Sequence, residues 1–212
     1  LFNALTQGAA EASNYPFSTV EPNVGMVEVP DERLGALYKL IKPADCISTS
    51  IRFVDIAGLV RGASRGEGLG NTFLGQVREA DALVHVLRCF EEQQVAHVDG
   101  EVDPLRDMET VELELILADL EILEKIVPQL EKIVQTEPQP PRRVELYALK
   151  KAQNGQQRGI SIRDLPLETK EIEAIQTYQF LTAKPVLFIA NVAETEAWDG
   201  GVRMKAIEER VG

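Results

Sequence analysis

Alternating apolar and polar positions predict two strands and two helices in the first part of the chain. Residues 23–29 alternate toward a strand, and residues 32–41 have helical spacing. A second strand is expected over 50–55, where it ends in an acidic residue. A Gly-rich loop over 58–70 then leads into a helix over 71–79.

Two nearly continuous apolar runs predict strands of a different kind. They cover residues 82–87 and 186–190. Such runs are typical of parallel strands that are covered on both faces. His85, inside the first run, is expected to be a core residue with its ring hydrogen-bonded. A last helix is expected over 201–210.

The middle of the chain is helical and amphipathic. Apolar residues recur every three or four positions over 107–134, which predicts one long helix with a bend at Pro128. A second helix is expected over 142–153, with Asn154-Gly155 as its C-cap. Pro166 and an acidic first turn predict a third helix toward Tyr178.

Strands that alternate with helices favour an α/β fold with a mostly parallel sheet. The helical middle interrupts this alternation between two strands, so we expect an inserted helical hairpin, called the helical arm below. The predicted organisation is a first part of the α/β domain over 1–103, the arm over 104–180 and a continuation of the domain over 181–212.

Charge and composition exclude several classes of protein. Asp and Glu number 34 against 22 Lys and Arg, a net charge of −12, so a nonspecific hold on nucleic-acid phosphates is not expected. A local basic patch is still possible at four residues of the arm, which can equally be one solvated helix face: Arg142, Arg143, Lys150 and Lys151. No apolar run is long enough to span a membrane, so no membrane partner is expected. The two cysteines lack zinc-ligand spacing, which favours reduced thiols in a cytoplasmic protein.

Three polar positions near strand ends carry candidate nucleotide chemistry. Asp55 could hold the water shell of Mg²⁺, and the backbone N–H of Gly58 could contact a γ-phosphate. Thr19, in an upstream polar loop, could ligate the same Mg²⁺. Asn191 and Glu194 follow the last apolar strand and could contact a base edge. Each pattern alone also fits an ordinary turn or capping residue, but their order together is that of a P-loop NTPase.

Four runs of residues resemble the YchF type of Obg-like ATPase, within the translation-factor class of P-loop GTPases. The runs are Asn14-Tyr-Pro-Phe-Ser-Thr-Val-Glu-Pro-Asn23, Asp55-Ile-Ala-Gly-Leu-Val-Arg-Gly-Ala-Ser-Arg-Gly-Glu-Gly-Leu-Gly-Asn71, Leu87-Arg-Cys-Phe90 and Phe180-Leu-Thr-Ala-Lys-Pro-Val186, which leads into Asn191-Val-Ala-Glu194. The resemblance implies a Ras-like P-loop NTPase fold with an inserted coiled-coil arm. It also implies a ribosome partner.

The resemblance further implies a preference for ATP over GTP. The guanine-recognising Asn-Lys-x-Asp of ordinary GTPases is replaced here by Asn191-Val192-Ala-Glu194. Guanine requires one carboxylate at a fixed reach, which the longer Glu194 misplaces, whereas Asn191 can still face the N6/N7 edge of adenine. Phe90 would pack on the base, although a core Phe at a strand end fits equally well.

The catalytic group is also expected from the resemblance. Leu59 stands where many GTPases carry a water-orienting Gln, and an aliphatic side chain cannot position the nucleophile. His97 aligns with a family His suspected of this role, and an imidazole could orient water or accept its proton. The alternative is a surface His.

One element of the family is missing from the printed sequence. No Gly-x-x-x-x-Gly-Lys-Ser/Thr occurs in it, and in the family Leu1 would directly follow that phosphate-binding loop and the first strand. The family's last strands and C-terminal TGS domain are not matched either. We therefore expect these residues to be the middle of a longer protein and to be inactive by themselves.

The sequence thus predicts an Obg-like ATPase that binds ATP with Mg²⁺ and hydrolyses it slowly as a ribosome-associated switch. One alternative is a GTP-specific GTPase of the same superfamily. The other is a noncatalytic interaction module, in which the helical arm is functional and the nucleotide site is vestigial.

Overall fold

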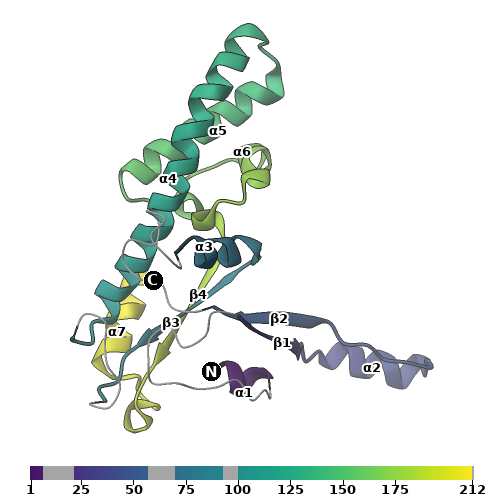
Figure 1. Cartoon of the computed structure of the whole chain (residues 1–212). Coiled ribbons are helices and arrows are strands. Elements are labelled where there is room, and N and C mark those ends of the chain that lie inside the picture. The colour runs from purple at the N-terminus through teal and green to yellow at the C-terminus, as the bar shows by residue number, and fades with distance from the viewer. Residues whose placement is uncertain (7–21, 57–69, 93–99, 212) are drawn as a thin grey trace. The chain divides into compact units, whose positions relative to one another are not determined.

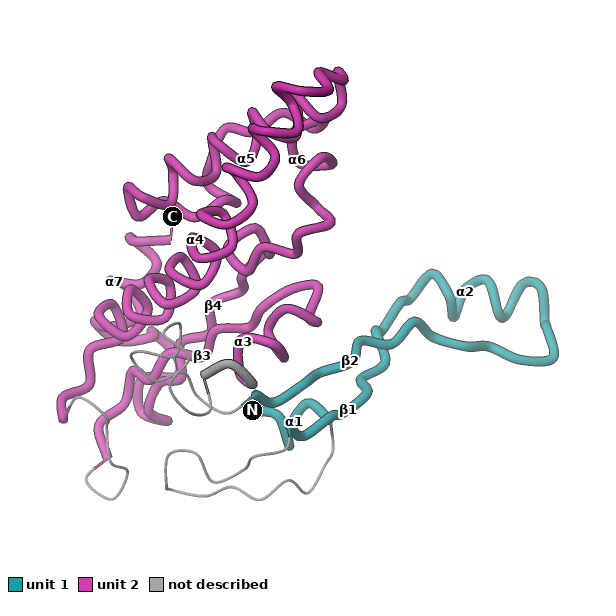
Figure 2. Tube along the Cα trace, turned by 45° about the horizontal axis from the view of Figure 1, so that its top comes forward, with its two compact units in different colours: residues 1–58 teal, residues 59–212 magenta. Residues whose placement is uncertain are grey.

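A computed structural model of the chain describes residues 1–6, 22–56, 70–92 and 100–211, with the backbone alone at 70–72. These residues fall into two compact units, unit 1 over 1–58 and unit 2 over 59–212 (Figure 2). Each unit is described by itself.

Unit 1 is a two-stranded antiparallel sheet with two helices. Its elements are α1 (Phe2–Thr6), β1 (Asn23–Glu28), α2 (Glu32–Ile41) and β2 (Ser50–Asp55). The strands pair from Asn23 opposite Asp55 to Glu28 opposite Ser50. The antiparallel register shows that the connection over 29–49 returns the chain beside β1 instead of crossing over to a parallel strand. One antiparallel pair is compatible with the expected sheet, which is mostly rather than wholly parallel.

Helix α2 has the bounds that its sequence predicts, because residues at both ends stop it. The Asp31 side chain accepts a hydrogen bond from the backbone N–H of Arg33 at 2.9 Å and caps the first turn. At the other end Lys42 is left-handed, with φ of 49°, and its N–H donates to the Tyr38 carbonyl at 2.9 Å.

Unit 2 contains a parallel strand pair and the helical arm (Figure 1). Its elements are α3 (Gly70–Glu79), β3 (Leu83–Arg88), α4 (Pro104–Thr136), α5 (Pro140–Gln157), η2 (Ile162–Asp164), α6 (Thr169–Ile175), η3 (Gln176–Tyr178), η4 (Leu181–Ala183), β4 (Val186–Asn191), η5 (Glu194–Glu196) and α7 (Gly201–Val211). The η elements are single 3₁₀ turns.

The strand pair of unit 2 is covered on one face only. On that face Leu87 of β3 and Phe188 of β4 pack with Met108 of α4 and Ile207 of α7. The opposite face exposes three apolar side chains, those of Val84 (42%), Val86 (44%) and Leu187 (61%). The expectation that these strands are covered on both faces is therefore wrong for the residues that the structure describes.

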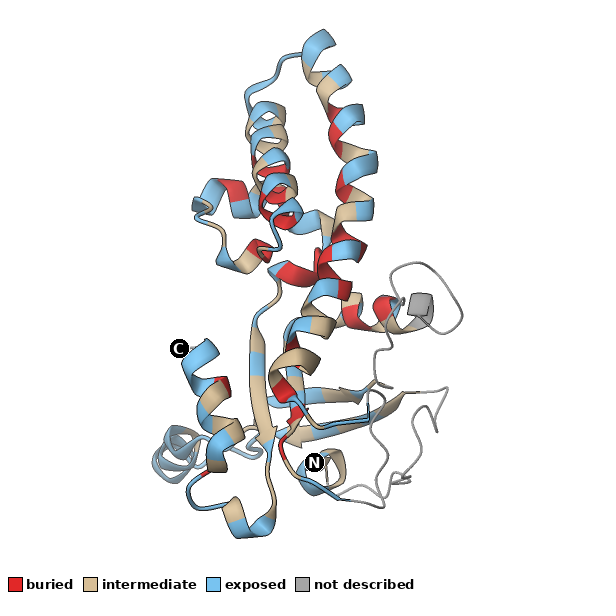
Figure 3. Cartoon of the chain, turned by 90° about the vertical axis from the view of Figure 1, so that its left-hand side faces the viewer, coloured by how far each residue is buried: buried red, intermediate tan, exposed pale blue. Residues whose placement is uncertain are grey.

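The arm has its own apolar core between α4 and α5, which lie side by side (Figure 1). Buried positions recur along both helices in Figure 3. The core consists of Leu123, Val127 and Leu130 from α4, Ala148, Leu149 and Ala152 from α5, and Ile162, Ile175 and Phe180 from the segment that follows. Helix α4 continues through Pro128 to Thr136. The predicted helical hairpin is present.

Two predicted helix ends in the arm are wrong. Helix α5 continues past Asn154-Gly155 to Gln157, and Leu165 packs on Gly155 so closely that a Cβ atom there would lie 2.5 Å from Leu165 Cδ2. This glycine therefore serves close packing rather than a C-cap. Helix α6 begins at Thr169 instead of Pro166, because Glu168 and Glu171 form a reciprocal capping box.

Candidate nucleotide site

The carboxyl ends of β3 and β4 meet at one edge of unit 2. The strands are parallel, with Arg88 opposite Asn191, and the backbone N–H of Cys89 donates to the Asn191 carbonyl at 2.8 Å. This register places Phe90, two residues past the end of β3, beside the end of β4 at Asn191. Ligands of α/β folds bind at such strand ends.

Arg88 shapes the loop that follows β3. Its Nε donates to the Phe90 carbonyl at 3.1 Å, and one terminal nitrogen donates to the Glu92 carbonyl at 3.2 Å. Its guanidinium carbon lies 4.8 Å from the centroid of the Phe90 ring. The half-buried Phe90 is thus held by a cation–π contact and by its own backbone.

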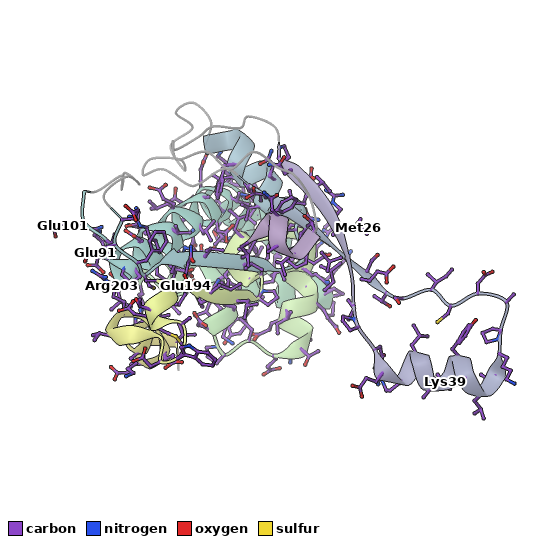
Figure 4. All side chains as sticks on the ribbon, turned by 90° about the horizontal axis from the view of Figure 1, so that it is seen from below. Met26, Lys39, Glu91, Glu101, Glu194 and Arg203 are labelled. Atoms are coloured by element: carbon purple, nitrogen blue, oxygen red, sulfur yellow. The ribbon has the colours of Figure 1, made fainter. Side chains whose placement is uncertain are left out.

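Arg203 of α7 holds the same loop from another element. It donates to the Cys89 carbonyl at 3.3 Å and forms an ion pair with Glu91. The hydrogen bond that Arg203 donates to the Glu91 carboxylate raises the pKa of Arg203. Figure 4 shows Glu91, Arg203 and Glu194 gathered at one end of unit 2.

At the end of β4 and in the loop after it, one apolar side chain packs inward and two polar side chains are exposed. Val192 is half-buried and packs against the apolar cluster of Leu87, Cys89, Met108 and Ile207. Asn191 and Glu194 are exposed, and Glu194 begins the 3₁₀ turn η5. The two polar side chains proposed for base recognition are therefore free of the core, whereas Val192 belongs to it.

The remaining candidates divide between unit 1 and undescribed segments. Asp55 is exposed at the last position of β2. Thr19, Gly58 and His97 lie outside the described residues, as does Leu59. Within the described ranges, no group of three or more His, Cys, Asp or Glu side chains is placed to hold a metal ion.

His85 is a half-buried residue on the covered face of the strands. Its ring centroid lies 5.7 Å from that of Phe188. Burial lowers the pKa of His85, which favours the neutral imidazole. His85 thus packs on Phe188 in the body of unit 2, and the expected hydrogen bond of its ring stays a prediction.

The basic residues of the arm are mostly engaged with acids. Arg142 pairs with Glu137 at 3.0 Å and Lys150 with Glu131 at 2.5 Å. Lys151 pairs with Glu171 at 2.9 Å. Such pairing favours a solvated helix face over a patch for RNA phosphates.

Among the helices that the structure describes, none combines the length and the apolar composition of a membrane span.

Two residues that matter in this geometry were not among the predicted site residues. Arg88 had a signal, because a cation two positions before an aromatic residue at a strand end can reach its ring and its carbonyl. Arg203 had none, since 112 residues separate it from its partner Glu91.

A family model described as "50S ribosome-binding GTPase" matches residues 1–120. The ribosome-binding ATPase YchF of Haemophilus influenzae is 48% identical over 194 residues, which cover 92% of this chain and 53% of the relative. The ribosome-binding ATPase YchF of Bacillus subtilis is 44% identical over 199 residues, which cover 94% of this chain and 54% of the relative. The chain thus spans about half the length of the curated relatives it matches.

A solved structure shows the same similarity in three dimensions. The Schizosaccharomyces pombe YchF GTPase matches with a TM-score of 0.76 at 33% identity, over 99% of this chain and 57% of that chain. This match confirms the predicted P-loop NTPase fold class. Homology to the YchF ribosome-binding ATPases is also confirmed, and the chain belongs to the family of 50S ribosome-binding GTPases.

Proposed function

We propose that the chain is part of an ATPase that binds ATP with Mg²⁺, hydrolyses it slowly and acts as a switch on ribosomes in the cytoplasm. The relatives support this by name, since the bacterial ones are called ribosome-binding ATPases. The S. pombe relative is called a GTPase, so the choice of base must be argued from the residues themselves.

One observation carries the choice of ATP. Asn191 and Glu194 project from the joined strand ends while Val192 packs inward. The loop therefore offers an amide and a long carboxylate but no lysine. Guanine N1–H and N2–H₂ favour a shorter carboxylate, whereas an Asn side chain can bind the N6/N7 edge of adenine in a bidentate manner.

The other roles follow from the resemblance. Thr19 and Asp55 would hold Mg²⁺, directly and through its water shell. The Gly58 N–H would contact the γ-phosphate. Leu59 cannot orient the attacking water, so hydrolysis is slow unless His97 supplies that function.

The test uses the full-length protein, meaning a chain of the relatives' length that carries the family's phosphate-binding loop. Binding of fluorescent ATP and phosphate release are measured with Mg²⁺ present. Replacing Asn191→Ala should weaken ATP binding about tenfold, because a bidentate contact to a base contributes about 1–3 kcal/mol. Asn154→Ala, at an exposed position on α5, is the matched control and should bind as the wild type does.

Two results would count against the proposal. Equal ATP binding by the Asn191 and Asn154 variants would remove the base-recognition role. Absence of binding for both ATP and GTP would instead favour the interaction-module alternative, with the arm as the functional part.

A further inference from the structure

The segment between the arm and β4 is a buried junction. We define the junction as residues 180–185, with the sequence Phe-Leu-Thr-Ala-Lys-Pro. Leu181 and Thr182 are 0% exposed and Phe180 is 2% exposed. The junction leads directly into β4, which ends at Asn191. The sequence resemblance singles out this run, but the proposed nucleotide site gives it no role.

A buried carboxylate ties the junction to the arm. Asp119, in the middle of α4, is 0% exposed. It accepts hydrogen bonds from the backbone N–H groups of Leu181 at 2.9 Å and Thr182 at 2.8 Å, and from the Thr182 hydroxyl at 2.8 Å. Burial raises the pKa of Asp119, against the lowering effect of these donors. Burying a carboxylate costs free energy, which the three hydrogen bonds offset. From helix α4, Asp119 thereby caps the first backbone N–H groups of the 3₁₀ turn η4.

Helix α5 joins the same network. The side-chain amide of Gln156, which is 2% exposed, donates to the Thr182 hydroxyl oxygen. Thr182 therefore contacts both helices of the arm through one oxygen, as donor to Asp119 and acceptor from Gln156. This buried polar network connects the junction to both helices of the arm, although Gln156 Oε1 has no hydrogen-bond partner among the described residues.

Two residues further on, the junction holds α3. The Lys184 ammonium donates to the Arg78 carbonyl at 2.9 Å and also to the Ala80 carbonyl. Both carbonyls lie at the C-terminal end of α3, where a cation is favoured by the unpaired carbonyls. Burial removes water from the Lys184 ammonium and lowers its pKa. The two carbonyl oxygens replace part of that lost hydration. At its other end, α3 begins at Gly70, the last glycine of the Gly-rich run that contains Gly58.

We propose that the junction couples α3, which directly follows the Gly-rich run over 58–70, to the arm. Lys184 transmits a displacement of α3 to the junction, and Thr182 passes it to Asp119 and Gln156 of the arm. The coupling rests on the proposed nucleotide function. It is reciprocal: a partner bound to the arm changes ATP affinity by the factor by which ATP changes the affinity for that partner, typically about 5- to 150-fold.

Hydrogen exchange on the full-length protein tests this, with and without a non-hydrolysable ATP analogue and Mg²⁺. In the wild type the analogue should change amide protection in α3, in the junction and in α4–α5. In Lys184→Met the change in α3 should remain and the change in the arm should be lost. Lys125→Met is the matched control: Lys125 is exposed on α4 and pairs with Glu121 at 2.6 Å, so the substitution should leave the arm response intact.

A second pair of variants separates coupling from simple loss of structure. Thr182→Val removes the hydroxyl and should abolish the arm response, whereas Thr182→Ser keeps the hydroxyl and should retain it. An arm response that persists in Lys184→Met and Thr182→Val would overturn the coupling while leaving ATP binding established. A wild type that binds the analogue without any arm response would do the same. No binding of the analogue by the wild type would overturn the proposed function and the coupling together.

Discussion

Arg88 shows how one side chain can prepare a binding surface. Its guanidinium lies over the Phe90 ring and donates to the carbonyls of Phe90 and Glu92. The aromatic ring is therefore oriented before any ligand arrives. Preorganisation of this kind improves affinity because less side-chain freedom is lost on binding.

The first prediction concerns this contact in the full-length protein. Arg88→Met should weaken ATP binding about twofold to tenfold, since an aromatic stacking contact contributes about 0.5–1.5 kcal/mol beyond its buried area. Binding of inorganic tripolyphosphate, which has no base, should stay unchanged. Competition titrations measure both ligands, and Arg143→Met, at an exposed position of the arm, is the control. Equal losses for ATP and tripolyphosphate would show that Arg88 does not act through the base.

Tyr178 provides a second residue-scale case. Its hydroxyl donates to Glu145 Oε1 at 2.6 Å, and its ring stacks on Phe180 with centroids 5.7 Å apart. Burial, followed by the contact with Glu145, raises the pKa of Tyr178 from 10.0 to about 12. The folded state therefore holds this proton more tightly than the unfolded state.

The second prediction is a pH dependence. The Tyr178 contribution to stability should be complete below its ordinary pKa of 10.0 and should be lost as the pH rises toward about 12. Tyrosinate absorbance should show one late-titrating group, which Tyr178→Phe removes. That variant should lose about 1–2 kcal/mol at neutral pH for the missing hydrogen bond. Tyr147→Phe, at a 60% exposed position, should leave the late group and the stability unchanged.

At the scale of elements, prediction from sequence succeeded where the signals were local. The bounds of α2 and β2 agree with prediction because Asp31 and the alternation of apolar positions act within a few residues. The predicted end of α5 was wrong because Gly155 lies inside the helix. The Leu165 side chain packs on it so closely that a Cβ atom would collide there. The prediction that β3 is covered on both faces was wrong, because hydrophobic periodicity does not reveal what packs on a strand.

The third prediction compares two helical glycines. Gly155→Ala should destabilise the arm by about 1 kcal/mol, because the new methyl group collides with Leu165 and this outweighs the gain in helix propensity. Gly75→Ala in α3 has no atom within 4 Å of the new Cβ and should stabilise by about 0.5–1 kcal/mol. Chemical denaturation measures both changes. Shifts of the same sign would refute the packing role of Gly155.

At the scale of the whole molecule, the sequence predicted the family but not the long-range contacts that connect the elements. Motif order led to Asn191, Glu194 and Asp55 and to the correct family. The hydrogen bonds of Asp119 with Leu181 and Thr182 span more than 60 positions and leave no periodic signal. The roles of all the candidate site residues remain predictions, and Thr19, Gly58 and His97 also lie outside the described ranges.

The fourth prediction concerns the 212 residues taken alone. They contain no Gly-x-x-x-x-Gly-Lys-Ser/Thr, whose backbone N–H groups and Lys bind phosphate oxygens. Charge-assisted hydrogen bonds contribute about 1.5–3 kcal/mol each, so the absence of four costs at least roughly 6 kcal/mol, or about four decades in affinity. Calorimetric titration with ATP and Mg²⁺ should show no saturation at micromolar concentrations. Micromolar binding would contradict this prediction.

The most direct test of the central claim is a competition between ATP and GTP for the full-length protein with Mg²⁺ present. The geometry of Asn191, Val192 and Glu194 predicts that ATP displaces a fluorescent nucleotide at least about tenfold better than GTP, since one well-placed base contact is worth about 1.4 kcal/mol. Glu194→Asp should narrow that ratio by restoring the shorter carboxylate. A wild-type preference for GTP would contradict the account of base recognition and place the protein with the GTP-specific members of its superfamily.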